Sequence, residues 1–207
     1  LMMQIEAGWN QVGTPLGYAT DWQKMLFRSD VTNRAYTFME AVQNQILAPA
    51  VFWYRHDKQL QGYDWAVIDS AVADPWRGYW LKSNHSGRLM FTSTPSLRHS
   101  LLSGTADTSR TLARAVTGWQ VDMTLTNDVY IDRKNIFGIS TLDKRQPIPE
   151  PPHISEYCSF YFDTRHGPLT RDIKAPFDDM DDVISWDVTV ETRSGILEHE
   201  LTWKIPQ

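Results

Sequence analysis

The second half of the chain shows a regular two-residue alternation of apolar and polar side chains. Residues 119–126 (WQVDMTLT), 186–192 (WDVTVET) and 197–205 (LEHELTWKI) all follow it. Because successive side chains of a strand point to opposite faces of a sheet, the pattern predicts antiparallel strands with one buried and one solvated face. The alternation assigns three tryptophans to the buried face: Trp119, Trp186 and Trp203.

Further strands are predicted elsewhere in the chain. Residues 157–162 (YCSFYF) are apolar on both faces, which is typical of a central strand. In the first half, strands are expected on both sides of a break near 7–8, of a polar turn near 57–62 and of a second turn at 84–87. We therefore expect an all-β fold of two antiparallel β-sandwich or jelly-roll-like units, or one composite sandwich.

One short helix is predicted near residues 38–47. Thr37 and Glu40 have capping-box spacing, an apolar stripe follows, and Pro49 is expected to end the helix. A stretch rich in Ser, Thr, Gly and Ala, without aromatic residues, then separates the two halves. The predicted organisation is a module containing the helix at 1–94, a connection at 95–117 and a second sandwich module at 118–207.

Composition and sequence pattern argue against a nucleic-acid partner, an internal disulfide and a membrane span. A net charge of -5 over 207 residues, with no run of Lys or Arg, argues against a nucleic-acid partner. The single cysteine, Cys158, excludes an internal disulfide. No apolar run approaches the ~18 residues of a membrane span, so no membrane insertion is expected. No signal-peptide pattern opens the sequence, and we expect the chain to be a piece of a longer polypeptide.

Motifs of known catalytic chemistry are absent from the sequence. It contains no Gly-x-Ser-x-Gly elbow, no phosphate-binding glycine loop and no pair of histidines at ligand spacing. Cys158 lies in a strand predicted to be buried, where a thiol is usually an inert apolar group. His199 shares the apolar face of its strand. We therefore predict no catalytic residue and no cofactor, and a hydrolase acting through a pair of carboxylates is the least favoured alternative.

Calcium is the metal that the acidic residues could suit, since it prefers several carboxylate and carbonyl oxygens from one loop. The stretch DDMDD offers one set, and DRKNIFG offers a smaller one. Neither has the spacing of an EF-hand loop, so a solvated acidic turn is the favoured interpretation of both. The candidate ligands are Asp178, Asp179, Asp181 and Asp182 in the first stretch, and Asp132 and Asn135 in the second.

Aromatic residues are the remaining candidates for ligand binding. Flat tryptophan and tyrosine rings often form sugar-binding surfaces, and the chain has nine tryptophans and eight tyrosines. Trp9 and Trp22 bracket a Gly/Pro-rich turn and are expected to pack inward. Five rings have no clear inward assignment and are the candidate ligand-binding residues: Tyr54, Tyr63, Trp65, Trp76 and Trp80.

The stretch GWNQVGTPLGYATDW, residues 8–22, resembles the "GWN-L-[IV]-G-N-P" opening of a β-sandwich module found in large exported bacterial surface proteins, often ones with type IX secretion sorting domains. The helix stretch TFMEAVQNQIL and the strand stretch DPWRGYWLKSN match the same module, and Gln11 and Thr14 depart from its commoner residues. The second half is similar to the β-module that comes next in those proteins. The resemblance marks these fold-signature residues: Gly8, Trp9, Asn10, Pro15, Trp22, Gly78, Tyr79 and Trp80.

The resemblance implies a secreted or cell-surface location and attachment to neighbouring domains of a longer polypeptide. It brings no catalytic residues. We therefore expect a non-catalytic accessory module that acts as a spacer, a stabiliser or a weak interaction unit for a glycan or protein at the cell surface. A dedicated carbohydrate-binding module is the main alternative. The sheet edges are also candidates for pairing with another chain.

Overall fold

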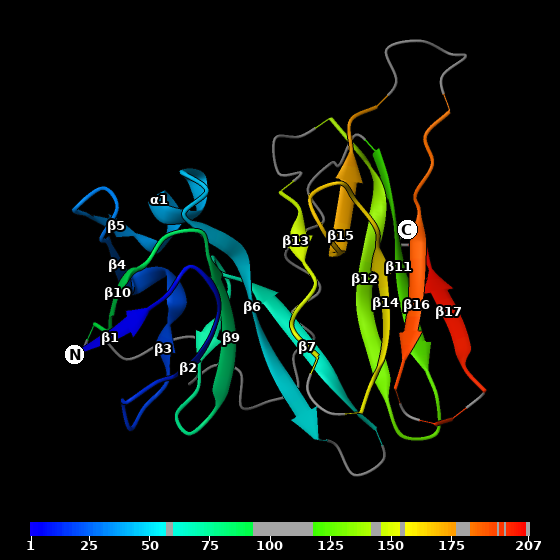
Figure 1. The fold of residues 1–207 in the computed structure, drawn as a ribbon, viewed down its shortest axis with the longest axis horizontal. Coiled ribbons are helices and arrows are strands. Elements are labelled where there is room, and N and C mark those ends of the chain that lie inside the picture. Colours follow the sequence, from blue (N-terminus) through cyan, green and yellow to red (C-terminus); the bar gives the residue numbers. More distant parts are fainter. Residues whose placement is uncertain are drawn as a thin grey trace. The chain divides into compact units, whose positions relative to one another are not determined.

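The computed structural model describes residues 1–56, 60–92, 118–141, 146–153, 156–176, 183–193, 195–196 and 198–205. The chain divides into two compact units, one made of Leu1–Trp53 and Trp65–Thr108 and the other of Tyr54–Asp64 and Ser109–Gln207. Strands dominate both units, so the expected all-β fold is confirmed (Figure 1). Residues 54–64, at the tip of a hairpin in the predicted first module, count with the second unit.

Two four-stranded sheets build the first unit. One sheet has the order β1 (Met2–Ile5), β10 (Gly87–Met90), β4 (Leu26–Ser29) and β5 (Arg34–Thr37). The other has the order β2 (Gly8–Gly13), β9 (Gly78–Ser83), β6 (Leu47–His56) and β7 (Gln61–Val67). A short pair of strands, β3 (Thr20–Asp21) and β8 (Val72–Ala73), accompanies them, with a 3-10 turn at Trp22–Lys24.

Side chains from both four-stranded sheets share one core. Phe27 and Leu89 come from the first sheet, Val51 and Leu81 from the second, and all four are fully buried in the same cluster. This is the packing of a β-sandwich, in which the apolar faces of two sheets meet. Trp22 joins this core, as its position in the sequence predicted.

Hydrogen bonds from the Asn10 side chain hold the backbone at the start of the opening motif. Trp9 is half-buried, with its ring edge-on to Phe52 at a centroid distance of 5.6 Å. Asn10 accepts a hydrogen bond from the Glu6 amide at 2.9 Å and donates to the Glu6 and Gly8 carbonyls at 2.8 and 3.1 Å. Gly8 has φ +109°, a backbone conformation that glycine adopts without steric cost. Asn10 and Gly8 therefore fix the link between β1 and β2, which lie in different sheets.

The helix α1 (Phe38–Gln43) begins as predicted and ends early. The Glu40 amide donates to the Thr37 hydroxyl at 3.2 Å, and the Thr37 amide donates to the Glu40 carboxylate at 2.8 Å, so the capping box is confirmed. The predicted end near residue 47 is wrong. Gln45 takes a left-handed φ of 56°, which stops the helix, and the chain enters β6 at Leu47.

The turn predicted at residues 84–87 does not make a hairpin. Both flanking strands, β9 and β10, are present, but β9 pairs with β2 and β6 whereas β10 pairs with β1 and β4. The turn therefore carries the chain from one sheet of the sandwich to the other. Local turn residues predict that a turn forms, but they do not determine which strands pair across it.

A single seven-stranded sheet forms most of the second unit. Its order is β16 (Val188–Thr192), β14 (Cys158–Phe162), β15 (Leu169–Lys174), β12 (Ile131–Ser140), β11 (Gly118–Thr126) and β17 (Glu200–Lys204), with β13 (Ile148–Pro149) pairing with β15. The position of β14 between two strands confirms the prediction for YCSFYF. The pair β12–β15 is parallel, which departs from the expected all-antiparallel pairing.

The sheet of the second unit folds over itself to make a small core, since β14 also lies against β11 and β12. Leu125 of β11 packs there with Phe160 and Phe162 of β14. The predicted burial of two tryptophans is wrong, because Trp119 is 45% exposed and Trp203 is 64% exposed. Both lie where the described strands do not cover the sheet.

Candidate functional site

The five candidate rings differ in exposure and in the unit to which they belong. Trp65 is buried, Trp80 and Tyr63 are half-buried, and Tyr54 is 38% exposed. Tyr54 and Tyr63 belong to the second unit, whereas the three tryptophans belong to the first. Tyr54 and Tyr63 lie together, and their rings meet edge to face at a centroid distance of 5.4 Å.

Trp76 is the exposed member of the set. Its side chain is 95% accessible to solvent, and its backbone has a left-handed φ of 64°, which is uncommon for a bulky residue. The loop around it is held by an ion pair of 2.7 Å between Arg77 and Asp74. The Arg77 guanidinium also lies 5.8 Å from the ring centroid of Trp53. The first unit therefore displays a tryptophan on a loop whose neighbouring residues are fixed.

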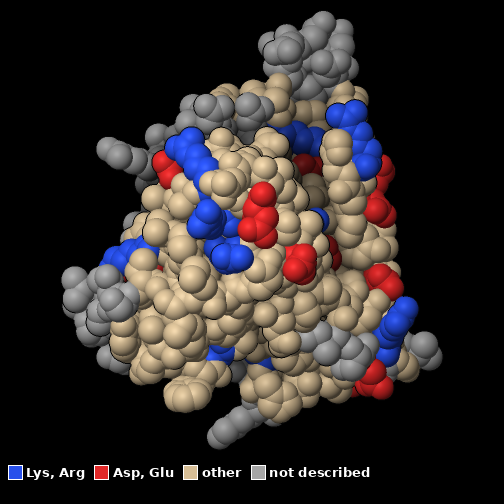
Figure 2. All heavy atoms as spheres, turned by 60° about the vertical axis from the view of Figure 1, so that its left-hand side comes forward, with Lys and Arg blue, Asp and Glu red and all other residues tan. Residues whose placement is uncertain are grey.

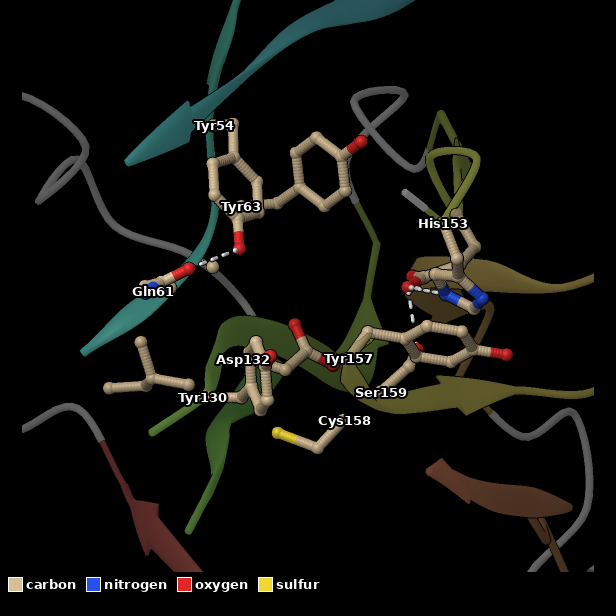
Figure 3. Close-up of a pocket in the computed structure, with 12 residues that line it drawn as sticks. Tyr54, Gln61, Tyr63, Tyr130, Asp132, His153, Tyr157, Cys158 and Ser159 are labelled. Atoms are coloured by element: carbon tan, nitrogen blue, oxygen red, sulfur yellow. Dashed lines mark hydrogen bonds and ion pairs between the residues drawn. The ribbon is translucent and has the colours of Figure 1, made fainter. Parts of the chain in front are cut away.

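A cavity lies within the second unit, beside the Tyr54–Tyr63 pair (Figure 3). The volume of the cavity is about 20 Å³. A cavity needs roughly 10 to 15 Å³ to hold one water molecule, so this one has room for one or two waters. Its lining is rich in ionisable and aromatic groups: Tyr54, Tyr63, Tyr130, Tyr157, Asp132, Glu150, His153 and Cys158.

Two buried carboxylates, Asp132 and Glu150, line this cavity. The Phe160 amide donates to Asp132 at 2.6 Å, which ties β14 to β12. Glu150 accepts the Ser159 hydroxyl at 2.8 Å and the Thr170 hydroxyl at 2.6 Å. Burial, reinforced by the charge of Glu150, raises the pKa of Asp132 well above its usual value of 3.8. The buried pair therefore favours keeping a proton on Asp132.

His153 and Tyr157 close another side of the cavity. Their rings are stacked, with centroids 3.8 Å apart and planes at 27°, and Figure 3 shows the imidazole lying over the phenol ring. The imidazole Nε2 lies 3.5 Å from a Glu150 oxygen, close enough for an ion pair when the ring is protonated. The Tyr157 hydroxyl donates to Glu191 at 2.6 Å, and burial together with this bond raises the pKa of Tyr157 to about 12.

Cys158 is a protonated thiol in this setting. Its side chain is buried, as the sequence predicted, and it is a free cysteine. Burial, with a smaller contribution from the neighbouring carboxyl group of Asp132, raises the pKa of the Cys158 thiol to about 12. Since the thiolate is the nucleophilic form, a thiol with this pKa is a poor nucleophile at neutral pH.

A β-bulge brings Asp132 into the core. Leu125 pairs with Asp132 and Met123 pairs with Asn135, so β12 has one more residue than β11 between these two pairs. Lys134 supplies the irregularity through a left-handed φ of 64°, and Asp132 and Asn135 are both buried as a result. Two-residue alternation cannot reveal such a bulge, so the grouping of Asp132, Glu150 and His153 was missed. The one signal was the polar DRKN run inside an otherwise apolar strand.

The calcium site suggested by the acidic stretch stays a prediction. Asp178, Asp179, Asp181 and Asp182 lie outside the described residues. Within the described part of the chain, no group of three or more His, Cys, Asp or Glu side chains is arranged to hold a metal ion. Asp132 and Asn135 are strand residues rather than members of a ligand loop.

Charges of both signs are interspersed on the face drawn in Figure 2, in small groups separated by uncharged surface. None of the helices among the described residues is long and apolar enough to span a membrane. No protein-family model matches the chain, and comparison with characterised proteins and with solved structures found no significant match.

Proposed function

We propose that the chain is a non-catalytic accessory module of an exported bacterial protein, acting as a spacer, a stabiliser or a weak interaction unit. The observation that carries this proposal is how the buried polar groups are used. Asp132 bonds the backbone of β14, and Glu150 bonds the hydroxyls of Ser159 and Thr170, so both carboxylates join strands of the sheet. The cavity beside them has room for one or two waters, not for a sugar ring or a peptide.

The test separates a structural carboxylate from a catalytic one. The wild-type chain and the variants Asp132→Asn and Glu150→Gln are assayed against panels of glycosides, esters and peptides. The proposal expects no turnover above the buffer rate for any of the three proteins. Turnover by the wild type that disappears in both folded variants would overturn it and favour the hydrolase alternative.

A second readout concerns the role as a stabiliser. The domain that adjoins this chain in its parent protein is expressed with and without it, and its resistance to proteolysis is measured. The proposal expects faster cleavage of the neighbour when the module is absent. A neighbour of unchanged resistance and unchanged unfolding midpoint would leave the spacer role and remove the stabiliser role.

Carbohydrate binding through Trp76 is a second candidate function, and one observation favours it. The ring is 95% exposed on a loop with a left-handed backbone, so the fold displays it rather than packs it. The flat apolar face of a pyranose packs on such rings. A glycan array with wild type, Trp76→Ala and the control Trp119→Ala tests this role. Trp119 is a partly exposed tryptophan of the other unit. Binding lost in Trp76→Ala alone supports it, and an array without specific binding rejects it.

A further inference from the structure

The core face of the second unit continues onto its edge strand β17, where no described strand covers it. Leu201 pairs with Leu125 and Trp203 pairs with Met123 across the antiparallel β11–β17 ladder. Directly paired residues lie on the same face of a sheet, so Leu201 and Trp203 share the face on which Leu125 is buried in the core. Nevertheless Leu201 is 37% exposed and Trp203 is 64% exposed. Their apolar surface is available to a partner.

β17 also has a free edge. In the described residues it pairs with β11 only and stands last in the strand order, next to β11 (Figure 1). An edge strand offers unpaired N–H and C=O groups to any strand of compatible sequence. Backbone groups and apolar side chains therefore point to the same kind of partner, an extended segment that lengthens the sheet and covers its inner face.

The sequence of β17, ELTWK, is complementary to itself in the antiparallel direction. A two-fold axis at Thr202 places Glu200 opposite Lys204, Leu201 opposite Trp203, and the two Thr202 residues opposite each other. Opposite charges and apolar pairs at directly opposed positions stabilise an antiparallel ladder. The charged pair and the apolar pair also fall on separate faces, as the two-residue period of a strand requires.

The other edge strand, β16, lacks this property. Its sequence, VTVET, read antiparallel to itself about Val190, places Thr189 opposite Glu191 and forms no pair of opposite charges. Glu191 is in addition bonded to the Tyr157 hydroxyl. Of the two strands that end the described strand order, β17 alone is therefore self-complementary.

We propose that two copies of the chain associate by antiparallel pairing of β17 with β17, in the register that sets Thr202 opposite Thr202. The two seven-stranded sheets then become one continuous sheet across the two-fold axis. Each Glu200 meets the Lys204 of the other copy, and Leu201 and Trp203 of both copies form one apolar patch. This is an isologous interface, closed at two subunits. It does not depend on whether the module is accessory or sugar-binding.

The expected association is weak. A five-residue strand is only about 17 Å long, and such an interface falls at or below the small end of specific protein interfaces. Interfaces of this size give concentration-dependent association, so the dimer is expected to form over about 1 to 500 µM. Sedimentation velocity of the full chain over this range follows the shift from a mass of 23.9 kDa to twice that mass.

Charge reversal tests the register. In Glu200→Lys, two lysines oppose each other at both ends of the ladder, and in Lys204→Glu two glutamates do so. Each single variant is expected to associate at least about tenfold more weakly than the wild type. A 1:1 mixture of the two variants places Lys opposite Glu at every charged position, so mixing is expected to restore association. The double variant E200K/K204E is expected to dimerise like the wild type.

Folding is controlled within the same set. Glu200 faces neutral Thr126 in its own sheet, so E200K is the cleaner variant, whereas Lys204 faces Asp122 and K204E is also made with Asp122→Asn. Far-UV circular dichroism checks each fold. Amide hydrogen exchange at residues 200–204 that slows with concentration supports the proposal. Wild type that stays monomeric at about 500 µM, or single variants that dimerise as well as the wild type, overturns it.

Discussion

Truncation of Glu150 to alanine is expected to weaken the second unit strongly. Glu150 is the acceptor for two buried hydroxyls, and Ser159 and Thr170 are 2% and 3% exposed, respectively. Without the carboxylate, neither hydroxyl keeps this partner, and only the one or two waters that fit the cavity can replace it at Ser159, which lines the cavity. An unsatisfied buried donor costs about 1 to 3 kcal/mol, so the two together predict a loss of about 2 to 6 kcal/mol in the free energy of unfolding.

Glu150→Gln is the matched control. Glutamine has nearly the same shape and keeps one acceptor oxygen for one hydroxyl. The other hydroxyl can turn and accept from the new amide NH₂, because a hydroxyl is both donor and acceptor. The expected loss for Glu150→Gln is therefore within about 1 kcal/mol. The difference between the two variants isolates the hydrogen bonds from the charge.

Urea unfolding measures both variants, with hydrogen exchange of peptides from 156–174 to assign the transition to the second unit. A typical domain is stable by about 5 to 15 kcal/mol, so a loss in the upper half of the predicted range is expected to lower the midpoint visibly or abolish the transition. A Glu150→Ala midpoint equal to that of the wild type would refute the reasoning. Equal losses in the two variants would show that the charge, rather than the hydrogen bonds, is what matters.

Three further perturbations address the same cavity. Burial raises the folded pKa of Asp132 above 3.8, so its contribution to the free energy of unfolding is full below pH 3.8 and is lost as pH rises through that raised pKa. Asp132→Asn is expected to remove this pH dependence, measured as urea midpoints over a pH series, and an unchanged pH dependence would contradict the prediction. A Cβ at Gly62 would overlap the carbonyl oxygen of Ile131, so Gly62→Ala is expected to lower the free energy of unfolding by about 1 to 3 kcal/mol. Gly17 has open space around it, so the control Gly17→Ala is expected to change the free energy of unfolding by no more than about 0.5 kcal/mol. The Cys158 thiol, with a pKa of about 12, is expected to react with a thiol reagent at least about a hundredfold more slowly than a small free thiol near neutral pH until urea unfolds the unit; fast labelling of the folded chain would contradict its burial.

Strand positions were largely predictable from the sequence, and strand partners were not. The alternating stretches became β11, β16 and β17, and the Thr37–Glu40 spacing marked the start of the helix. The 84–87 turn was also located, yet it joins two sheets rather than two paired strands. A side-chain period reports which residues share a face, because the pleat is local. Pairing depends on residues far apart in the chain.

The candidate site shows the same division. Asp132 was noticed as an oxygen ligand in a loop, but the bulge at Lys134 turns it into the core beside Glu150, which is 18 positions further along the sequence. The five aromatic candidates were chosen because no inward assignment existed for them. Their exposures range from 8% at Trp65 to 95% at Trp76, a spread that the surrounding packing determines.

The sequence by itself determined the β-rich class, the position of most strands, the start of the helix and the face on which each alternating residue lies. These follow from local backbone geometry and from the pleat of a strand. Only the tertiary structure decided which faces are covered. Leu125 and Trp203 lie on the same face of adjacent strands, yet one is buried and the other exposed, because β14 packs over the first and no described strand covers the second.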